Sequence, residues 1–208
     1  MLLSLAVLLA IATGCELTPT DQQNPGGSAA GDSTAAEATA RLGSLTVAKA
    51  GSMRYYSREK FPHWRSTGEN CDVRDTVLKR DGTKVKVSGC NVVAGSWRSV
   101  YDSTTLNSPT KVDIDHVVPL ANAWRSGASA WTDDKRADFA NDIDRPQLIA
   151  SSQTSNRSKG DQDPSTWKPK TTGTWCEYAE DWIEVKSYWK LAVTTAEKSA
   201  LKDMLEKC

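Results

Sequence analysis

The chain has 208 residues, of which 38% are hydrophobic and 25% are charged, as is typical of one soluble globular domain with its own core. The formal net charge is zero, which excludes a strong long-range attraction of the whole molecule to nucleic acid. Eight tryptophans are many for this length, and we expect several of them in the core and one or two exposed.

The first fifteen residues, MLLSLAVLLAIATGC, are typical of an export segment, because their apolar run is too short to span a bilayer comfortably. Residues 12–15 resemble a bacterial lipobox, in which Cys15 becomes lipidated and forms the new N-terminus. No Lys or Arg precedes the apolar run, and Ala12 stands where Leu is usual, so cleavage and secretion without a lipid is the alternative. Either way we expect an extracytoplasmic location, with membrane contact only through Cys15.

Residues 16–50 are rich in Ala, Ser, Thr, Gly and Pro. They contain too few aromatic and branched side chains to bury a core, so we predict a disordered tether. The folded domain is then expected over residues 51–208.

Four further cysteines, Cys71, Cys90, Cys176 and Cys208, predict two disulfides in an exported domain. Three connectivities are possible. We favour Cys71–Cys90 and Cys176–Cys208, because each pair closes a local segment. A zinc site is the competing interpretation, but the chain has no Cys-x-x-Cys spacing and two histidines in all.

In the first half of the domain, Asp81-Gly82 predicts a hairpin turn, and the residues on either side of it favour strands over 84–87 and 92–101. The segment KVDIDHVVPL (111–120) predicts another strand, which Pro119 ends.

The second half is expected to be mostly helical. We predict helices over 121–131 and 133–141, the latter capped by Thr132, then a short strand over 146–150 and a short helix over 151–159 that Gly160 stops. Thr194 and Glu197 predict a capping box for a last helix that ends at Cys208. Before it, a stripe at helical spacing predicts a core-facing helix, formed by Trp175, Tyr178, Trp182, Val185 and Trp189.

The candidate chemistry centres on Asp115 and His116, in the sequence Asp-Ile-Asp-His (113–116). In a strand, Asp113 and Asp115 point to one face and His116 to the other. Asp115 and His116 can therefore share a site only if the strand ends or bends at His116. The second histidine, His63, is expected to be a packing or surface residue.

A second segment, SNRSKG (155–160), follows the expected strand at 146–150. An Asp-His strand followed by an Asn on a short helix resembles the ββα-metal architecture of HNH nucleases. More specifically, DIDHVVPLANAWRSGA (113–128) and NDIDRPQLIASSQTSNRSKGDQDPSTWKP (141–169) resemble the exported actinobacterial HNH-type nucleases, which share their catalytic module with the C-terminal domain of the GmrSD modification-dependent restriction enzymes. The resemblance covers residues 54–208, with supporting matches in FPHW (61–64), CDVRDTVLKRDG (71–82), GSWRSVYD (95–102) and CEYAEDWIEVKSYWKL (176–191).

The resemblance implies that His116 is the general base and that Asp115 and Asn156 are metal ligands. One carboxylate and one amide oxygen, with water completing the shell, suit Mg²⁺, and Mn²⁺ is expected to substitute for it. An imidazole that titrates near neutrality suits general base catalysis.

Further candidates surround this set. Arg74, Arg157 and Lys159 are candidates for phosphate contact. The remaining three residues are supporting candidates: Asp113 for orienting His116, and Asp144 or Gln147 in place of the Asn that supports the loop in many HNH modules.

The sequence therefore predicts an α+β fold: a ββα-metal (HNH, His-Me finger) core with a small antiparallel sheet, flanking helices and two disulfides. We expect a monomer that hydrolyses phosphodiester bonds of DNA, with RNA as a second candidate substrate, at low sequence specificity because no separate recognition module is found. A non-catalytic surface lipoprotein that binds nucleic acid or a cell-envelope partner is the rival, and the intact set of Asp115, His116 and Asn156 favours the enzyme.

Overall fold

The structure, a computed structural model, describes residues 35–208, so the expected export segment, Cys15 and residues 16–34 lie outside the described residues. The helices are α1 (Ala35–Ser44), α2 (Val73–Asp81), α3 (Leu120–Arg125), α4 (Asp133–Ala140), α5 (Gln153–Lys159), α6 (Trp175–Trp189) and α7 (Thr195–Leu205). The strands are β1 (Ser66–Gly68), β2 (Cys71–Asp72), β3 (Gly82–Ser88), β4 (Asn91–Arg98), β5 (Thr105–Leu106), β6 (Val112–His116) and β7 (Leu148–Ser152).

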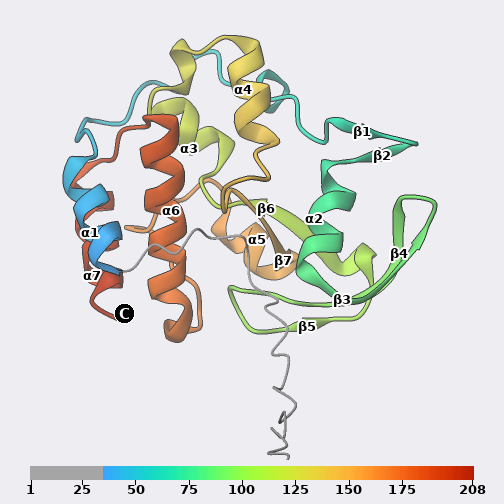
Figure 1. Ribbon diagram of the computed structural model, residues 1–208. Helices are drawn as coiled ribbons and strands as arrows, with labels where there is room; N and C mark the ends of the chain where they lie inside the picture. The colour runs from blue at the N-terminus through green and yellow to red at the C-terminus, as the bar shows by residue number, and fades with distance from the viewer. Residues whose placement is uncertain (1–34) are drawn as a thin grey trace, which may run out of the picture.

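These strands form three small antiparallel sheets, with the orders β1–β2, β3–β4–β5 and β6–β7. Helices α1, α6 and α7 pack side by side, and the β3–β4–β5 sheet lies on the opposite side of the molecule (Figure 1). The β6–β7 pair and α5 lie between them. The predicted α+β class with small antiparallel sheets and flanking helices is confirmed.

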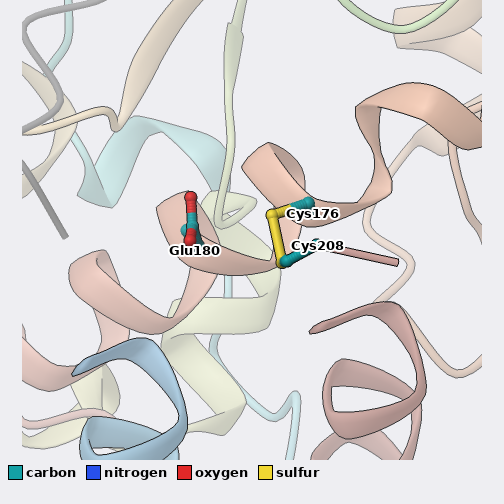
Figure 2. Close-up of side chains that lie close together, drawn as sticks. All are labelled: Cys176, Glu180 and Cys208. Carbon is teal, nitrogen blue, oxygen red and sulfur yellow. A yellow bond between two sulfur atoms is a disulfide. The ribbon is translucent and has the colours of Figure 1, made fainter. Parts of the chain in front are cut away.

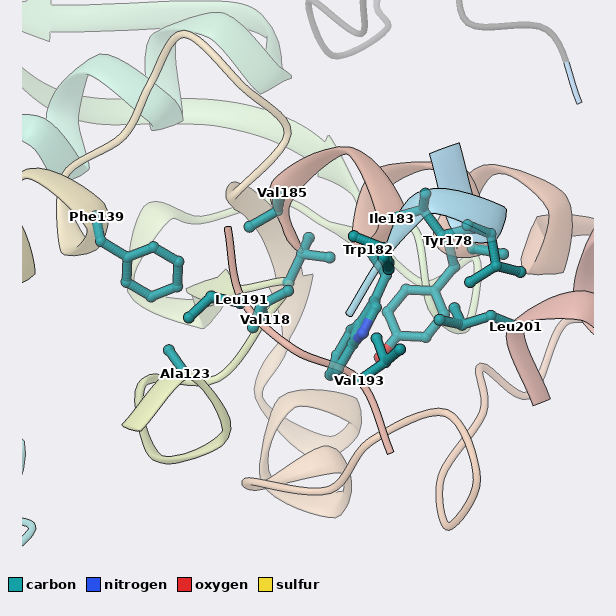
Figure 3. Packing of buried hydrophobic residues seen from close by; sticks show 14 of the residues in the cluster. Val118, Ala123, Phe139, Tyr178, Trp182, Ile183, Val185, Leu191, Val193 and Leu201 are labelled. Atoms are coloured by element: carbon teal, nitrogen blue, oxygen red, sulfur yellow. The ribbon is translucent and has the colours of Figure 1, made fainter. Parts of the chain in front are cut away.

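Two hydrophobic clusters form the core. The larger one joins α1, α3, α4, α6 and α7, and Figure 3 shows Phe139, Tyr178, Trp182 and Leu201 among its buried side chains. The aromatic stripe predicted for the C-terminal helix lies in or against this cluster, as expected. The smaller cluster packs α2 against β4 and the β6–β7 pair, around Val77 and Trp97.

The β6–β7 pair contributes to both clusters. Ile149 belongs to the larger cluster, whereas Ile114 and Leu148 belong to the smaller one. Side chains of paired residues share a face, and His116 pairs with Leu148 while Asp115 pairs with Ile149. The pleat therefore directs Asp115 and His116 to opposite faces, as the sequence predicted, and β6 ends at His116.

The boundary predicted at residue 50 is wrong for residues 35–50. Helix α1 packs on α6 and α7, with Ala38 and Leu42 buried, and Leu45 is buried just beyond it. These three side chains are spaced four and three residues apart, so they form one helical stripe. Composition alone does not reveal this stripe, because it consists of three apolar residues. Three are enough for a helix that packs on a larger core.

The hairpin predicted at Asp81-Gly82 is also wrong. Asp72 caps α2 in a capping box with Asp75, and the helix runs on to Asp81 before β3 begins at Gly82. The turn lies instead between Ser88 and Asn91, where Gly89 has a φ of 60°.

Both favoured disulfides, Cys71–Cys90 and Cys176–Cys208, are present. Thr132 caps α4, Gly160 ends α5, and Thr194 and Glu197 form the predicted capping box of α7, which ends at Leu205 rather than at the last residue. Over residues 35–208, no helix is both long enough and apolar enough to cross a membrane.

Candidate active site

A cavity of about 370 Å³ opens at the end of β6. Asp115, His116 and Asn156 all line it, together with Tyr56, Arg58 and others. Because the strand ends at His116, residues from both of its faces reach this one cavity. The three residues singled out in the sequence are thus brought together.

His116 is almost fully buried, and its Nε2 atom lies 3.0 Å from the carbonyl oxygen of Ala140. Burial lowers the pKa of His116 to about 3, although the Ala140 carbonyl opposes this shift. The ring is therefore neutral at pH 7. Since a carbonyl can only accept a hydrogen bond, Nε2 carries the proton and Nδ1 keeps a free lone pair. The arrangement presents Nδ1 as a base.

Asp115 is held by two donors on one of its oxygens. The Tyr101 hydroxyl donates to Asp115 Oδ2 at 2.6 Å, and Lys159 Nζ lies 2.8 Å from the same atom. Lys159 is fully buried and also donates to the backbone oxygen of His116 at 2.9 Å. Burial lowers the pKa of Lys159, while the Asp115 carboxylate raises it. Both donors engage Oδ2, which leaves Asp115 Oδ1 as the oxygen with capacity for a further partner.

Asn156, on α5, is oriented by Asp113 on β6. Its Nδ2 atom donates to Asp113 Oδ2 at 3.1 Å. The amide nitrogen is thereby committed to Asp113, and the amide oxygen is the acceptor left for a ligand. Asp113 thus contacts Asn156 rather than His116, which was the partner expected from the sequence.

Of Asp144 and Gln147, the two candidates for the loop-supporting role, Gln147 supports the segment that follows His116. Its side chain accepts from Val118 N at 3.1 Å and donates to the Val118 carbonyl at 2.9 Å. Asp144 is exposed and lies 3.7 Å from Arg145 in an ion pair. The geometry therefore favours Gln147 for this role.

None of the three cations predicted to contact phosphate lines the cavity. Arg74 donates to the carbonyl oxygens of Pro109 and Val112, which ties α2 to the start of β6. Lys159 is buried against Asp115, and Arg157 is exposed on α5. His63 packs edge-on against His116, at 6.1 Å between ring centroids, and so acts as a packing residue.

Three residues that line the cavity or contact the elements around it had no role assigned from the sequence. Tyr101 is buried and follows β4, and burial and Asp115 raise its pKa well above 10, so it stays a donor. Arg58 lines the cavity from outside the two long motifs. Asp102 accepts from the hydroxyls of Ser152 and Ser155, at 2.6 and 2.8 Å. Tyr101 and Asp102 end the segment GSWRSVYD, which the sequence analysis noted. Their roles depend on contacts with Asp115, Ser152 and Ser155, which the local sequence does not reveal.

The oxygen donors left on Asp115 and Asn156 fit a hard divalent cation such as Mg²⁺, and the cavity has room for water to complete its shell. Among residues 35–208, the one cluster of at least three His, Cys, Asp or Glu side chains with metal-binding spacing is Cys176, Glu180 and Cys208. Figure 2 shows that its two sulfurs are bonded to each other, so they are not available as zinc ligands.

Comparison of the sequence with known proteins places the chain in a family. An "Uncharacterized secreted protein" from Arthroderma benhamiae is 52% identical over 176 residues, which cover 84% of this chain and 86% of the relative. No solved structure matches the chain. Residues 72–204, which include β6, β7 and α5, match the family described as "GmrSD restriction endonucleases, C-terminal domain". The chain belongs to the family of the C-terminal domain of the GmrSD restriction endonucleases.

Proposed function

We propose that the protein is a metal-dependent endonuclease of the HNH type, which hydrolyses phosphodiester bonds of DNA, with RNA as a second candidate substrate. The observation that carries the proposal is the convergence of Asp115, His116 and Asn156 on one cavity, with His116 Nδ1 left as a free base. The strand–strand–helix unit of β6, β7 and α5 then serves as the ββα-metal core.

In this mechanism His116 Nδ1 takes a proton from the water that attacks phosphorus. A new oxygen–phosphorus bond forms, the bond to the 3′ oxygen breaks, and that oxygen takes a proton from solvent. The products carry a 5′ phosphate and a 3′ hydroxyl.

Asp115 and Asn156 would hold the cation through the oxygens described above. When bound, Mg²⁺ or Mn²⁺ supplies positive charge against the developing charge on phosphate and on the leaving oxygen. Lys159 and Tyr101 keep the Asp115 carboxylate fixed, and Asp113 keeps the amide oxygen of Asn156 turned outward.

An extracytoplasmic place of action fits the two disulfides and the printed name of the fungal relative. We propose that the enzyme acts as a monomer on nucleic acid outside the cytoplasm, with Cys15 as the candidate lipid anchor.

The test is plasmid nicking by the purified full chain, with Mg²⁺ or with EDTA, beside His116→Ala. We expect nicking with Mg²⁺ and none with EDTA. His116→Ala should lower the rate about 100-fold to 10,000-fold, the usual contribution of a general base.

The matched control is His63→Ala, which removes the neighbouring imidazole and should keep the rate within about threefold, because His63 donates or accepts nothing in the cavity. Equal rates for wild type and His116→Ala would refute the assignment of the base. Binding of DNA without any Mg²⁺-dependent nicking would favour the non-catalytic rival.

A further inference from the structure

A single guanidinium stands at the wall of the cavity. Among the described residues that line it, Arg58 is the one Lys or Arg. Arg58 is exposed, and among residues 35–208 no hydrogen bond or ion pair is found for its guanidinium group. Arg58 and His116 line the same cavity. An unpaired cation at this place has capacity for an anion.

The backbone around Arg58 is well fixed. Arg58 begins a short 3₁₀ turn, in which Phe61 N donates to the Arg58 carbonyl at 3.0 Å, and Phe61 is fully buried. On the other side, the Tyr56 ring packs edge-on against Trp124 at 5.9 Å. The two aromatic anchors fix the backbone that carries Arg58, so binding need order only its side chain.

The surroundings suit a phosphodiester better than a carboxylate metabolite or a peptide. Tyr56 and Met53 line the same cavity beside Arg58 and give an apolar wall next to the charge. A nucleotide presents the same combination, since an apolar sugar and base flank each phosphate. Arg offers a planar fork of donors that matches two phosphate oxygens.

We propose that Arg58 binds the phosphate of the nucleic-acid strand that enters the cavity beside His116. This inference rests on the proposed function and names the substrate contact that it requires. Arg58 takes the part that the sequence assigned to Arg74, Arg157 and Lys159. It lies before residues 72–204, so the phosphate contact comes from a segment outside the part of the chain that matches the family.

The test compares wild type, Arg58→Ala, Arg58→Lys and Arg54→Ala as full chains. Arg54 is the matched control, because it is exposed on the same segment, lies over the Tyr55 ring at 4.6 Å and does not line the cavity. The probe is a fluorescein-labelled DNA duplex, whose binding is measured by anisotropy in EDTA at several salt concentrations. Cleavage of the same duplex is then measured with Mg²⁺.

We expect Arg58→Ala to raise Kd about tenfold and to lower the salt dependence of binding by about one counterion, as loss of one phosphate contact does. Arg58→Lys keeps the charge but loses the planar fork, so its Kd should lie between those of wild type and Arg58→Ala while its salt dependence matches wild type. Arg54→Ala should stay within about twofold of wild type.

If Arg58→Ala and Arg54→Ala weakened duplex binding equally, the inference about Arg58 would be wrong. Cleavage by the wild type in the same experiment would still support the proposed function. A wild type that neither binds nor cleaves the duplex would overturn both. Because Arg58 is exposed, thermal melting should show the same stability for all four proteins, and a variant with lower melting temperature would point to a structural role for Arg58 instead.

Discussion

At the scale of single residues, each polar side chain of the site has one hydrogen-bonding end fixed by a neighbour and the other end left for a ligand. Ala140 fixes Nε2 of His116, Asp113 fixes the amide nitrogen of Asn156, and Tyr101 with Lys159 fixes one oxygen of Asp115. Such second contacts hold a site in its productive geometry, and their loss commonly costs activity without unfolding the protein.

Tyr101→Phe tests this arrangement, since it removes the hydroxyl that donates to Asp115 and keeps the ring. We expect activity with Mg²⁺ to fall about 10-fold to 100-fold, and the Mg²⁺ concentration for half-maximal activity to rise. Initial rates over a Mg²⁺ titration check both.

The control for that variant is Tyr178→Phe in the adjacent ring, 5.6 Å away between centroids. The Tyr178 hydroxyl has no hydrogen-bond partner among the described residues, so its removal should change neither rate nor Mg²⁺ dependence. Equal losses in the two variants would mean that ring packing, and not the Asp115 contact, supports activity.

At the scale of elements, α5 is positioned by Asp102. The Ser152 hydroxyl caps α5 and donates to the Asp102 carboxylate, and Ser155 donates to the same oxygen from inside the helix. Burial raises the pKa of Asp102, but the hydrogen bonds from Ser152, Ser155 and Ser99 outweigh it, so the net pKa lies below the usual value of 3.8. The helix that carries Asn156 therefore depends on an ionised Asp102.

Asp102→Asn is expected to lower activity about tenfold and the free energy of unfolding by about 1 kcal/mol at pH 7, a value discounted for the partial exposure of the carboxyl. A carboxyl whose pKa is lower in the folded state stabilises above its unfolded pKa, and loses that contribution as pH falls through the folded value. Denaturant titrations should thus show a difference between wild type and variant that is full at pH 7 and shrinks below about pH 4.

The control is Asp138→Asn on α4, which removes a carboxylate from an exposed ion pair with Arg65. Such pairs contribute little, so this variant should match wild type at every pH. A difference for Asp102→Asn that stayed constant from pH 7 to pH 3 would contradict the role of its charge.

At the scale of the whole molecule, α1 completes the larger hydrophobic cluster. Ala38, Leu42 and Leu45 cover α6 and α7, and Ala48 N donates to the Val193 carbonyl at 2.9 Å. The N-terminal segment is thus part of the fold as far forward as residue 35, although it lies outside the family match.

A chain that starts at residue 51 should therefore be less stable than one that starts at residue 35. Loss of two buried leucines and an alanine predicts a decrease of about 4 kcal/mol in the free energy of unfolding. Urea titrations of the two proteins check this. Equal midpoints would mean that residues 35–50 do not stabilise the fold, as expected for the tether predicted from composition.

The sequence predicted most of what depends on local pattern. The capping box of α7, the Gly160 stop and the aromatic stripe of α6 follow from spacing between near neighbours, and each disulfide joins two cysteines that are consecutive in the order of the four. What it missed depends on contacts between distant segments. Tyr101 contacts Asp115 and Arg58 lines the cavity only because segments far apart in the sequence meet there, and no local pattern encodes those meetings.

The sequence predicted that Asp115 and His116 could share a site only if the strand ends or bends at His116. The structure meets that condition, and Gln147 holds the following segment against β7 through Val118. The hairpin prediction failed because it considered Asp81-Gly82 alone, where the pair favours a turn. The capping box at Asp72 starts a helix nine residues earlier, and Asp81 becomes its last residue.

Lys159 gives the Asp115 carboxylate a built-in counter-charge. A buried carboxylate normally resists folding until something neutralises it, but here the polypeptide supplies the neutralising group itself. Under the proposed function, assembly and loading become separate events: the chain can mature empty and acquire its ion wherever divalent ions are plentiful.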